Sequence, residues 1–267
     1  SVLSHFYIYL CILLSHASAT TDLSQWKLVW NDEFSGSKID LQKWDVENAP
    51  ASTNGELQFY TSREENIFLK DGYLVIQTLN EPYRDAEGEG YEYTSARINT
   101  AKTFTQTYGR YEARIKMPTG QGIWPAFWML GSNVNNVGWP ESGEIDIMEN
   151  PGYLPSKNMG NVHGPGYSGA NGLGGEFELP DNKLYPDDFH VFAVEWEPDV
   201  VRFYVDDNLY STVTKNDVPE GQKWVFDHPF YIIINTAVGG EWPGKPDATT
   251  KFPQQMLIDY VRVYVRK

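Results

Sequence analysis

The chain has 267 residues and a formal net charge of −15 at pH 7, and its length allows one large β domain or two small ones with a substantial core. The negative charge argues against nucleic acid as a partner, because nucleic-acid-binding proteins carry a basic surface. It also disfavours sulfated polysaccharides, which are bound by clustered Arg and Lys. Aromatic residues make up 15% of the chain and can serve either a core or a flat binding surface.

The N-terminal segment resembles a secretion signal. Residues 6–14 form a short apolar run without charge, and Ala17-Ser-Ala19 has the small-x-small pattern of a cleavage site. We therefore expect a signal peptide over residues 1–19 and a secreted, extracellular product. The run is too short to span a membrane, so no membrane partner is expected. Cys11 is the only cysteine, so residues 20–267 would contain no disulfide.

Most of the remaining chain reads as short strands separated by Gly, Pro, Asn and Asp. Residues 109–117 show the clearest alternation, which predicts Tyr111, Ala113, Ile115 and Met117 on a buried face and residues 110, 112, 114 and 116 in water. Other strands are expected at residues 26–30, 56–60, 73–77, 189–196, 201–205, 230–238 and 257–265. The acidic, Gly-rich residues 81–90 are predicted to form a surface loop.

This pattern predicts an all-β sandwich of antiparallel strands. No amphipathic helix of ten or more residues, internal repeat or low-complexity linker is visible in the sequence. Residues 20–267 are therefore expected to form a single domain, and no stretch of the sequence suggests an oligomer interface, so a monomer is expected.

The segment Glu144-Ile-Asp-Ile-Met-Glu149 places three carboxylates within six residues. On a strand, Glu144 and Asp146 share one face, but Glu149 has the wrong parity. A β-bulge at Ile147 or Met148 would bring Glu149 to the same face. A solvated acidic edge strand would explain the charges alone, but the apolar residues between the acids favour a packed central strand. Clustered acids with raised pKa values are typical of glycosidic bond cleavage, in which two carboxyls differ in proton affinity.

Two longer motifs resemble the signature of glycoside hydrolase family 16, in its laminarinase (endo-1,3-β-glucanase) branch. They are Gly122-Ile-Trp-Pro-Ala-Phe-Trp-Met129 and Trp139-Pro-Glu-Ser-Gly-Glu-Ile-Asp-Ile-Met-Glu149. Further matches run from Trp30-Asn-Asp-Glu-Phe34 to Asp259-Tyr-Val-Arg-Val-Tyr264. The resemblance implies a β-jelly roll of two curved antiparallel sheets whose concave face forms an open cleft. Other branches carry the shorter Glu-x-Asp-x-Glu form, so Met148 places this chain with the bulged group.

The resemblance also assigns roles to the acids, which spacing alone cannot order. It implies that Glu144 is the nucleophile, Glu149 the general acid/base and Asp146 their electrostatic helper in a retaining mechanism. No cofactor is expected for this reaction.

Several residues are candidates for binding the substrate. Trp124 and Trp128 share strand parity and could form a stacking platform, although both could instead lie in the core. Trp139 and Trp242 are candidates at the cleft edges. By resemblance, His163 reaches into the cleft, and Asn54 and Arg97 bond sugar hydroxyls, while Arg97 could also neutralise the acids. The candidates are thus Asn54, Arg97, Trp124, Trp128, Trp139, His163 and Trp242.

Asp259 shares strand parity with Leu257, Val261 and Val263, so an acid stands where an apolar residue is expected. A buried carboxylate needs a partner, which could be an Arg or a backbone N–H. The resemblance implies another partner, a structural calcium ion held by Glu33, the carbonyl of Gly72 and Asp259, all hard oxygen donors.

The sequence thus predicts a secreted endo-acting hydrolase that cleaves internal β-1,3 linkages of neutral, laminarin-like glucans. Mixed-linkage (1,3-1,4)-glucan, agar or carrageenan hydrolysis and transglycosylation are alternatives within the family, and low basicity counts against carrageenan. A non-catalytic β-glucan-binding protein is the alternative from a different class, but related recognition proteins lose the acids that this chain keeps.

Overall fold

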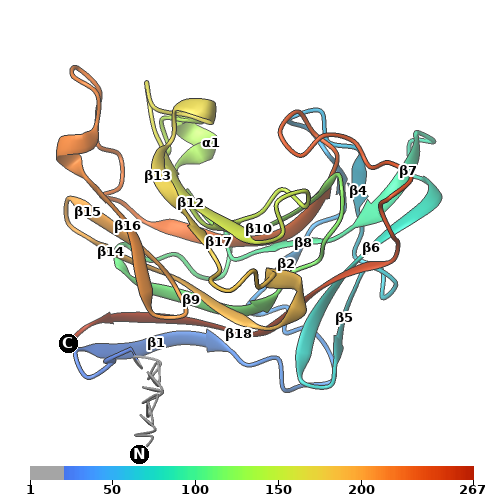
Figure 1. Cartoon of the computed structure of the whole chain (residues 1–267), viewed down its shortest axis with the longest axis horizontal. Helices are drawn as coiled ribbons and strands as arrows, with labels where there is room; N and C mark the ends of the chain where they lie inside the picture. Colours follow the sequence, from blue (N-terminus) through green and yellow to red (C-terminus); the bar gives the residue numbers. More distant parts are fainter. Residues whose placement is uncertain (1–20) are drawn as a thin grey trace, which may run out of the picture.

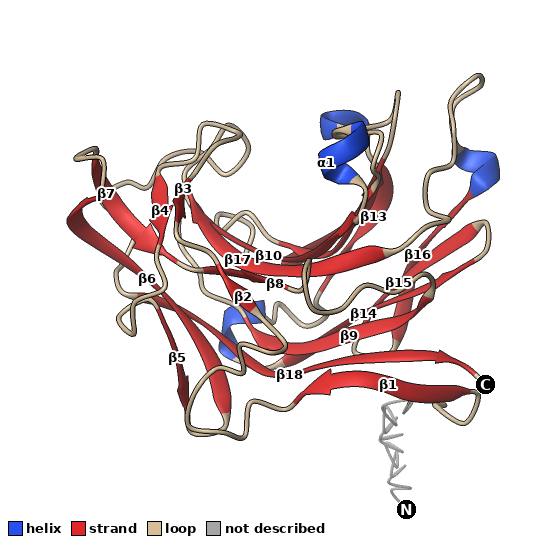
Figure 2. Cartoon of the chain, turned by 180° about the vertical axis from the view of Figure 1, so that it is seen from behind, coloured by secondary structure: helices blue, strands red, loops and turns tan. Residues whose placement is uncertain are grey.

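The computed structural model describes residues 21–267, which form two curved β-sheets packed face to face (Figures 1 and 2). The predicted all-β jelly-roll architecture is confirmed. The predicted signal peptide over residues 1–19 lies outside the described residues. None of the helices within residues 21–267 is long and apolar enough to cross a membrane.

The upper sheet in Figure 1 has seven strands. In spatial order these are β13 (Leu173–Glu178), β12 (Lys157–His163), β11 (Glu144–Glu149), β10 (Ile123–Gly131), β17 (Phe230–Val238), β8 (Arg97–Asn99) and β2 (Asp45–Val46). The central strands β11, β10 and β17 together contain many Ile and aromatic residues, which pack well on a pleated surface.

The second sheet has eleven strands. Its main path runs β16 (Asn208–Thr214), β15 (Val200–Val205), β14 (His190–Glu197), β9 (Gly109–Lys116), β18 (Gln254–Arg266), β6 (Tyr73–Arg84), β7 (Gly90–Ser95), β4 (Gln58–Tyr60) and β3 (Ala49–Pro50). In addition, β1 (Trp26–Asp32) pairs with β18, and β5 (Ile67–Lys70) pairs with β6. Among residues 21–267 the strand pairs are antiparallel except β4 beside β7.

Helical segments within the described chain are short, as the sequence predicted. They are α1 (Val134–Val137) and three 3₁₀ turns at Gly169–Asn171, Tyr185–Asp187 and Lys215–Asp217. The hydrophobic core lies between the sheets, where Phe127 and Met129 of β10 belong to the same buried cluster as Tyr111 and Ile115 of β9. Because strand side chains alternate, the other face of β10 points away from the core.

The prediction that the second face of β9 is exposed to solvent is wrong for Arg110 and Glu112. Arg110 is only 1% exposed and Glu112 only 5%. The register places Glu195 of β14 opposite Arg110, and the guanidinium contacts the carboxylates of Glu112 at 2.9 Å and Glu195 at 3.1 Å. The charges are therefore buried as an ion-paired cluster, which alternation alone does not reveal.

The predicted loop over residues 81–90 is also wrong in part. Strand β6 continues to Arg84 and β7 starts at Gly90, so only residues 85–89 connect them. Glu81 is held within the strand because its carboxylate accepts a hydrogen bond from Thr94 at 2.6 Å and pairs with Arg63. Polar side chains that pair across strands can thus occupy a strand that their composition disfavours.

Candidate active-site cleft

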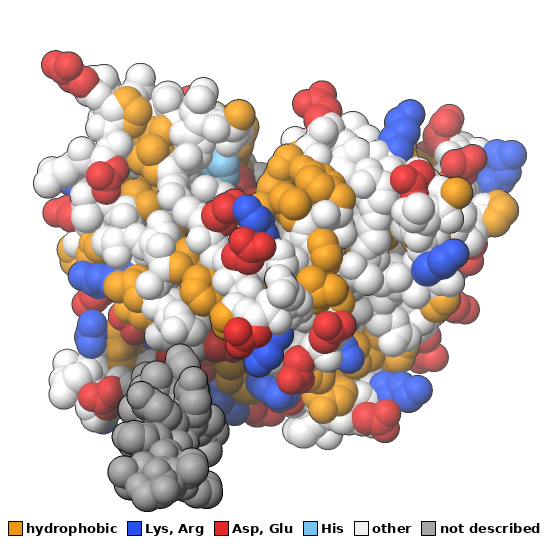
Figure 3. Space-filling view, viewed as in Figure 1, with side chains coloured by type: hydrophobic (Ala, Val, Ile, Leu, Met, Phe, Trp, Pro, Cys, Tyr) orange, Lys and Arg blue, Asp and Glu red, His pale blue; other side chains and the backbone are white. Residues whose placement is uncertain are grey.

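A cleft of about 840 Å³ lies on the face of the seven-stranded sheet that points away from the core. Figure 3 shows the molecule hollowed at its upper edge between two raised ends. All ten residues proposed for catalysis or substrate binding line this one cleft: Asn54, Arg97, Trp124, Trp128, Trp139, Glu144, Asp146, Glu149, His163 and Trp242. They come from strands and loops that are far apart in the sequence.

Strand β11 contains the bulge that the parity of its acids required. Pairing with β10 passes from Phe127–Met148 to Trp128–Asp146, which leaves Ile147 unpaired. Ile147 and Met148 are both fully buried in the core, so the strand turns two successive side chains inward. Glu149 therefore returns to the cleft face with Glu144 and Asp146, as predicted.

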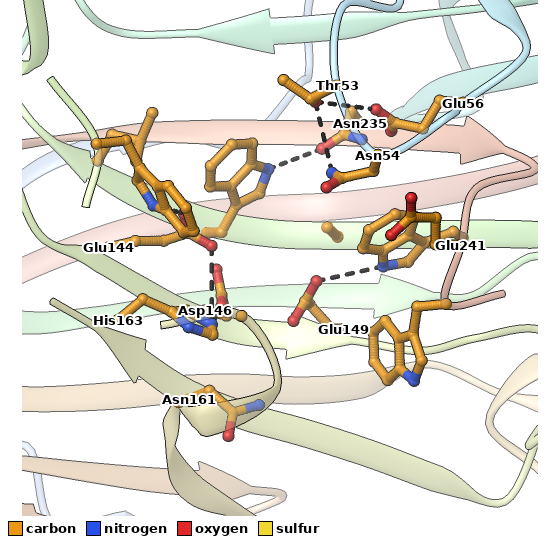
Figure 4. Close-up of a pocket in the computed structure, with 18 of the residues that line it drawn as sticks. Thr53, Asn54, Glu56, Glu144, Asp146, Glu149, Asn161, His163, Asn235 and Glu241 are labelled. Carbon is orange, nitrogen blue, oxygen red and sulfur yellow. Dashed lines mark hydrogen bonds and ion pairs between the residues drawn. The ribbon is translucent and has the colours of Figure 1, made fainter. Parts of the chain in front are cut away.

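Each outer acid receives an indole N–H. Trp139 Nε1 donates to Glu144 Oε2 at 2.7 Å, and Trp124 Nε1 donates to Glu149 Oε1 at 3.2 Å. Figure 4 shows Glu144, Asp146 and His163 close together, with Glu149 to their right. The bond to Glu144 is shorter and favours its charged form more strongly.

The three acids are expected to hold fewer than three negative charges at neutral pH. Burial, and then the charge of Glu144, raises the pKa of Glu149 to about 8. Burial and the charge of Asp146 also raise the pKa of Glu144, but His163 and the Trp139 N–H oppose this rise. Burial and the charge of Glu149 raise the pKa of Asp146. The pKa values of all three acids are thus raised, those of Glu144 and Asp146 well above their ordinary values, so the cluster holds protons at neutral pH, and the resemblance assigns the reacting proton to Glu149.

His163, at the end of β12, lies directly beside the acids. Its Nε2 is 2.9 Å from Asp146 Oδ2 and 4.0 Å from Glu144 Oε1. The closer contact lies within ion-pair distance but lacks hydrogen-bond geometry, since Asp146 Oδ2 has no hydrogen-bond partner among the described residues. Burial lowers the pKa of His163, so a largely neutral imidazole is expected at neutral pH.

Glu144, Asp146 and His163 also form a group that could bind a metal ion, with one ligand atom of each within 4.8 Å of the others. A metal ion there would occupy the carboxylate that the resemblance assigns as nucleophile. Family 16 glycosidases need no cofactor for catalysis, and the acids alone supply a proton donor and a nucleophile.

The tryptophans lie as the parity of β10 predicts. Trp124 and Trp128 point into the cleft together with Ala126 and Leu130, while Phe127 and Met129 between them are fully buried in the core. Trp242 packs edge-on against Trp124 with ring centroids 5.5 Å apart. The two strand tryptophans are therefore cleft residues and not inter-sheet core.

Arg97 lies at the cleft but makes no ion pair with the acids of β11. Its Nε donates to Glu47 Oε1 at 3.0 Å, and its guanidinium lies 5.1 Å from the centroid of the Trp128 ring. The suggestion that Arg97 neutralises the three acids is thus not supported by its contacts. Asn54 adopts a positive φ of 57°, and its carbonyl accepts a hydrogen bond from the Glu241 N–H at 2.9 Å.

Six polar residues of the cleft were not proposed as site residues from the sequence. They are Ser52, Thr53, Glu56, Asn161, Asn235 and Glu241. Asn235 had a detectable signal, because it interrupts the apolar run Tyr231-Ile-Ile-Ile in a central strand, where an unpaired amide would be costly. Asn161 lies opposite Asp146 in the β11–β12 register, which only the pairing reveals.

Two of the three residues predicted to bind calcium, Glu33 and Asp259, have other partners. The Glu33 carboxylate accepts two hydrogen bonds from Arg262, each 2.8 Å long, and Asp259 accepts one from Arg114 at 2.8 Å. Both carboxylates are already compensated by arginine, which does not fit an oxygen cage for a divalent cation.

The predicted burial of Asp259 is also wrong. A register shift between Ile258 and Tyr260 in the β18–β9 pair places Asp259 at a bulge. Ile258 and Val261 on its two sides are fully buried, and the Asp259 side chain keeps 32% of its exposure. The prediction assumed strict alternation and so placed Asp259 on the same face as Val261 and Val263. The bulge places Asp259 on the other face of the strand.

Comparison with known proteins agrees with this geometry. The model of Glycosyl hydrolases family 16 matches residues 43–262. A β-glucanase from Rhodothermus marinus is 43% identical over 251 residues, covering 90% of this chain and 85% of that protein.

Two solved structures are similar to this chain. One is the catalytic domain of an endo-1,3-β-glucanase (laminarinase) from Thermotoga petrophila RKU-1, which is 49% identical with a TM-score of 0.86, covering 91% of this chain and 98% of that one. The other is the endo-β-1,3-glucanase from Pyrococcus furiosus, 48% identical with a TM-score of 0.87, covering 91% and 95%. The chain belongs to glycosyl hydrolases family 16, in its laminarinase-type branch.

Proposed function

We propose that this protein is an endo-1,3-β-glucanase that cleaves internal linkages of neutral, laminarin-like β-glucans with retention of configuration. The observation that carries the proposal is the bulged strand β11, which brings Glu144, Asp146 and Glu149 to one face of a tryptophan-lined cleft. The named relatives act on β-glucans, and the family is one of glycoside hydrolases.

In the first step, the Glu144 carboxylate attacks the anomeric carbon while Glu149 gives its proton to the glycosidic oxygen. The C–O bond breaks, the shortened glucan leaves with that proton, and a glycosyl ester forms on Glu144. In the second step a water molecule passes a proton to Glu149 and attacks the same carbon, which releases Glu144 as a carboxylate. The raised pKa of Glu149, about 8, keeps it protonated for the first step.

Asp146 and His163 are proposed to support the nucleophile. Asp146 is 2% exposed at its side chain and separates the two reacting acids along the strand, so its protonation state sets the local charge. The neutral His163 ring closes that side of the cleft at 2.9 Å from Asp146. An Asp146→Asn variant should lose less activity than either glutamate variant.

The test is product analysis with laminarin, barley mixed-linkage glucan and agarose in parallel, using wild type, Glu144→Gln and Glu149→Gln. Glu220→Gln is the matched control, because it makes the same chemical change at an exposed residue outside the cleft. Fastest release of short oligosaccharides from laminarin, lost in both cleft variants and kept in the control, supports the proposal. Faster release from barley glucan would move the preference to mixed linkages, and binding of laminarin without cleavage would make the protein a glucan-binding protein.

Azide separates the two roles. In Glu144→Ala, azide can replace the missing nucleophile and should give a glycosyl azide of inverted anomeric configuration. In Glu149→Ala, azide should attack the glycosyl ester and give the retained configuration. The same configuration from both variants would contradict the assignment.

We also propose that the protein is secreted as a monomer. The support for secretion is the apolar run at residues 6–14 with the small-x-small site ending at Ala19, and the support for a monomer is that no stretch of the sequence suggests an oligomer interface. Sequencing the N-terminus of the exported protein should give Thr20 as its first residue. Retention inside the cell with residues 1–19 still attached would contradict secretion, and a dimer in size-exclusion chromatography would contradict the monomer.

A further inference from the structure

Trp128 of β10 is held from two sides, by Asn235 of the neighbouring strand β17 and by Arg97 of β8, the next strand in the sheet. Its indole Nε1 donates a hydrogen bond of 2.7 Å to Asn235 Oδ1, and the Arg97 guanidinium lies 5.1 Å from the ring centroid. Figure 4 shows the dashed bond from Asn235 to this indole deep in the cleft. With a cation over one face and an amide at its edge, the ring has a restricted orientation.

The Asn235 amide is itself fixed in one orientation. An indole N–H can only donate, so the oxygen of the amide must face Trp128. The amide nitrogen then faces the Tyr60 hydroxyl at 3.1 Å and donates to it. Asn235 is 6% exposed and Tyr60 4%, and breaking a hydrogen bond between buried groups leaves a polar atom unsatisfied. Tyr60, Asn235 and Trp128 therefore form one buried chain that ends at the cleft.

Arg97 is placed by the same neighbourhood. In the sheet register Asn235 lies opposite Arg97 of β8 on one side and opposite Ala126 of β10 on the other. Glu47 Oε1 accepts from Arg97 Nε at 3.0 Å and from Asn99 Nδ2 at 2.9 Å. The guanidinium thus rests between Glu47 and the ring of Trp128, and rotation of the ring would remove one of its two supports.

We propose that Asn235 is a positioning residue that locks the Trp128 ring and, through it, the Arg97 guanidinium, so that the two present one rigid sugar-binding surface. The inference rests on the proposed function, because the surface is assigned to the glucan. Asn235 has no hydrogen bond to the acids within the described residues, so its contribution lies in substrate affinity and not in the chemical steps.

The test is a double-mutant cycle of substrate affinity. The variants Asn235→Ala, Trp128→Phe and their combination are made in the Glu144→Gln background, which prevents turnover, and the Kd of a laminari-oligosaccharide is measured by calorimetry. Each single variant should weaken binding about tenfold, the cost of about one buried hydrogen bond. The double variant should weaken binding scarcely more than Trp128→Phe alone, because Phe has no N–H for Asn235 to accept. Effects that multiply to about a hundredfold would contradict the proposal.

A second readout does not depend on substrate. The near-ultraviolet circular dichroism of the free protein reports how tightly tryptophans are held, and Asn235→Ala should reduce the signal that Trp128→Phe removes. Asn235→Asp is the conservative control, since a carboxylate can accept from both the indole and the Tyr60 hydroxyl, and it should retain the wild-type spectrum. An unchanged spectrum in folded Asn235→Ala would overturn the proposal.

If Asn235→Ala does not fold, the Tyr60→Phe variant tests the proposal in its place. This variant keeps the ring in the core and removes only the outer hydrogen bond, so it should weaken binding two- to threefold. An unchanged Kd and an unchanged spectrum in Tyr60→Phe would overturn the proposal that Tyr60 helps Asn235 to hold Trp128. If the wild type neither binds nor cleaves β-glucan, the proposed function fails, and the spectra of the free variants still decide whether Asn235 locks Trp128.

Discussion

Tryptophan N–H groups act on both outer acids, a role that goes beyond stacking on sugars. Trp139 is 46% exposed at the cleft rim, yet its indole makes the shortest hydrogen bond to Glu144, at 2.7 Å. Because the indole N–H donates to the Glu144 carboxylate, Trp139 stabilises the charged form of the proposed nucleophile although its ring is exposed.

Trp139→Phe keeps an aromatic ring but removes this donor. We expect kcat to fall by about tenfold and the acidic limb of the pH profile to move to higher pH, because a carboxylate without its donor binds a proton more tightly. The measurement is kcat and kcat/KM between pH 4 and 9. Trp242→Phe is the matched control, a rim tryptophan that packs on Trp124; it should change KM and leave the limb in place. An equal shift of the limb in both variants would contradict the role of Trp139.

Glu149 should make stability depend on pH. Its folded pKa is about 8, raised from the ordinary value of 4.5, so the folded state binds more protons than the unfolded state between these values. Its contribution to stability is therefore full at low pH and is lost as pH rises through about 8. Glu149→Gln should have a Tm close to wild type near pH 5 and a Tm higher by a few degrees at pH 9. A constant difference in Tm across that range would contradict the raised pKa.

Two bulges show what strand patterns can and cannot predict. In β11 the bulge was predictable because three acids had to share a face and the middle residues were apolar. In β18 the bulge beside Asp259 left no such signal, since the sequence reads as plain alternation, and parity then put the acid on the wrong face. The burial of Arg110 beside Glu195 was equally invisible, because it depends on a pairing between strands 85 residues apart. Local periodicity predicts strands, while the partners of a charged side chain come from register.

The bulge in β11 can be tested by deleting Met148. The deletion restores strict alternation, so Glu144, Asp146 and the final glutamate still share the cleft face. It also removes a fully buried side chain, which should lower the free energy of unfolding by about 2–5 kcal/mol. We expect residual hydrolysis of laminarin clearly above that of Glu149→Gln, measured below the lowered Tm. A folded deletion variant as inactive as Glu149→Gln would contradict this account of the strand.

Arginine pairs occur where the resemblance implied calcium: Arg262 of β18 pairs with Glu33, just after β1, and Arg114 of β9 pairs with Asp259 of β18. Because Arg262 already neutralises Glu33 through two hydrogen bonds, calcium would have to displace it. We expect the Tm to change by less than about 1 °C on adding either EDTA or millimolar calcium. A rise of several degrees with calcium that is lost in Glu33→Gln would restore the calcium site.

The negative charge of the whole molecule extends into the cleft. Glu56 and Glu241 add to the three acids there, and the cleft cation Arg97 is paired with Glu47. An anionic chain would meet repulsion from those of these acids that are ionised.

Carboxymethylated 1,3-β-glucan should therefore be cleaved at least about tenfold more slowly than its neutral parent at low salt. The difference should shrink in 0.5 M NaCl, which screens charge and leaves the linkage unchanged. Initial rates of reducing-end release measure both effects. A salt-independent difference would point to steric exclusion, and equal rates at low salt would contradict charge-based selection.

The floor of the cleft is a single β-sheet, and strand β10 contributes side chains to both of its faces. Trp128 points to the substrate side while Phe127 and Met129 on either side of it fill the core. A core that loosens must therefore disturb the binding surface at the same moment. Loss of activity on heating and loss of folded structure should coincide in one transition, without an inactive but folded intermediate.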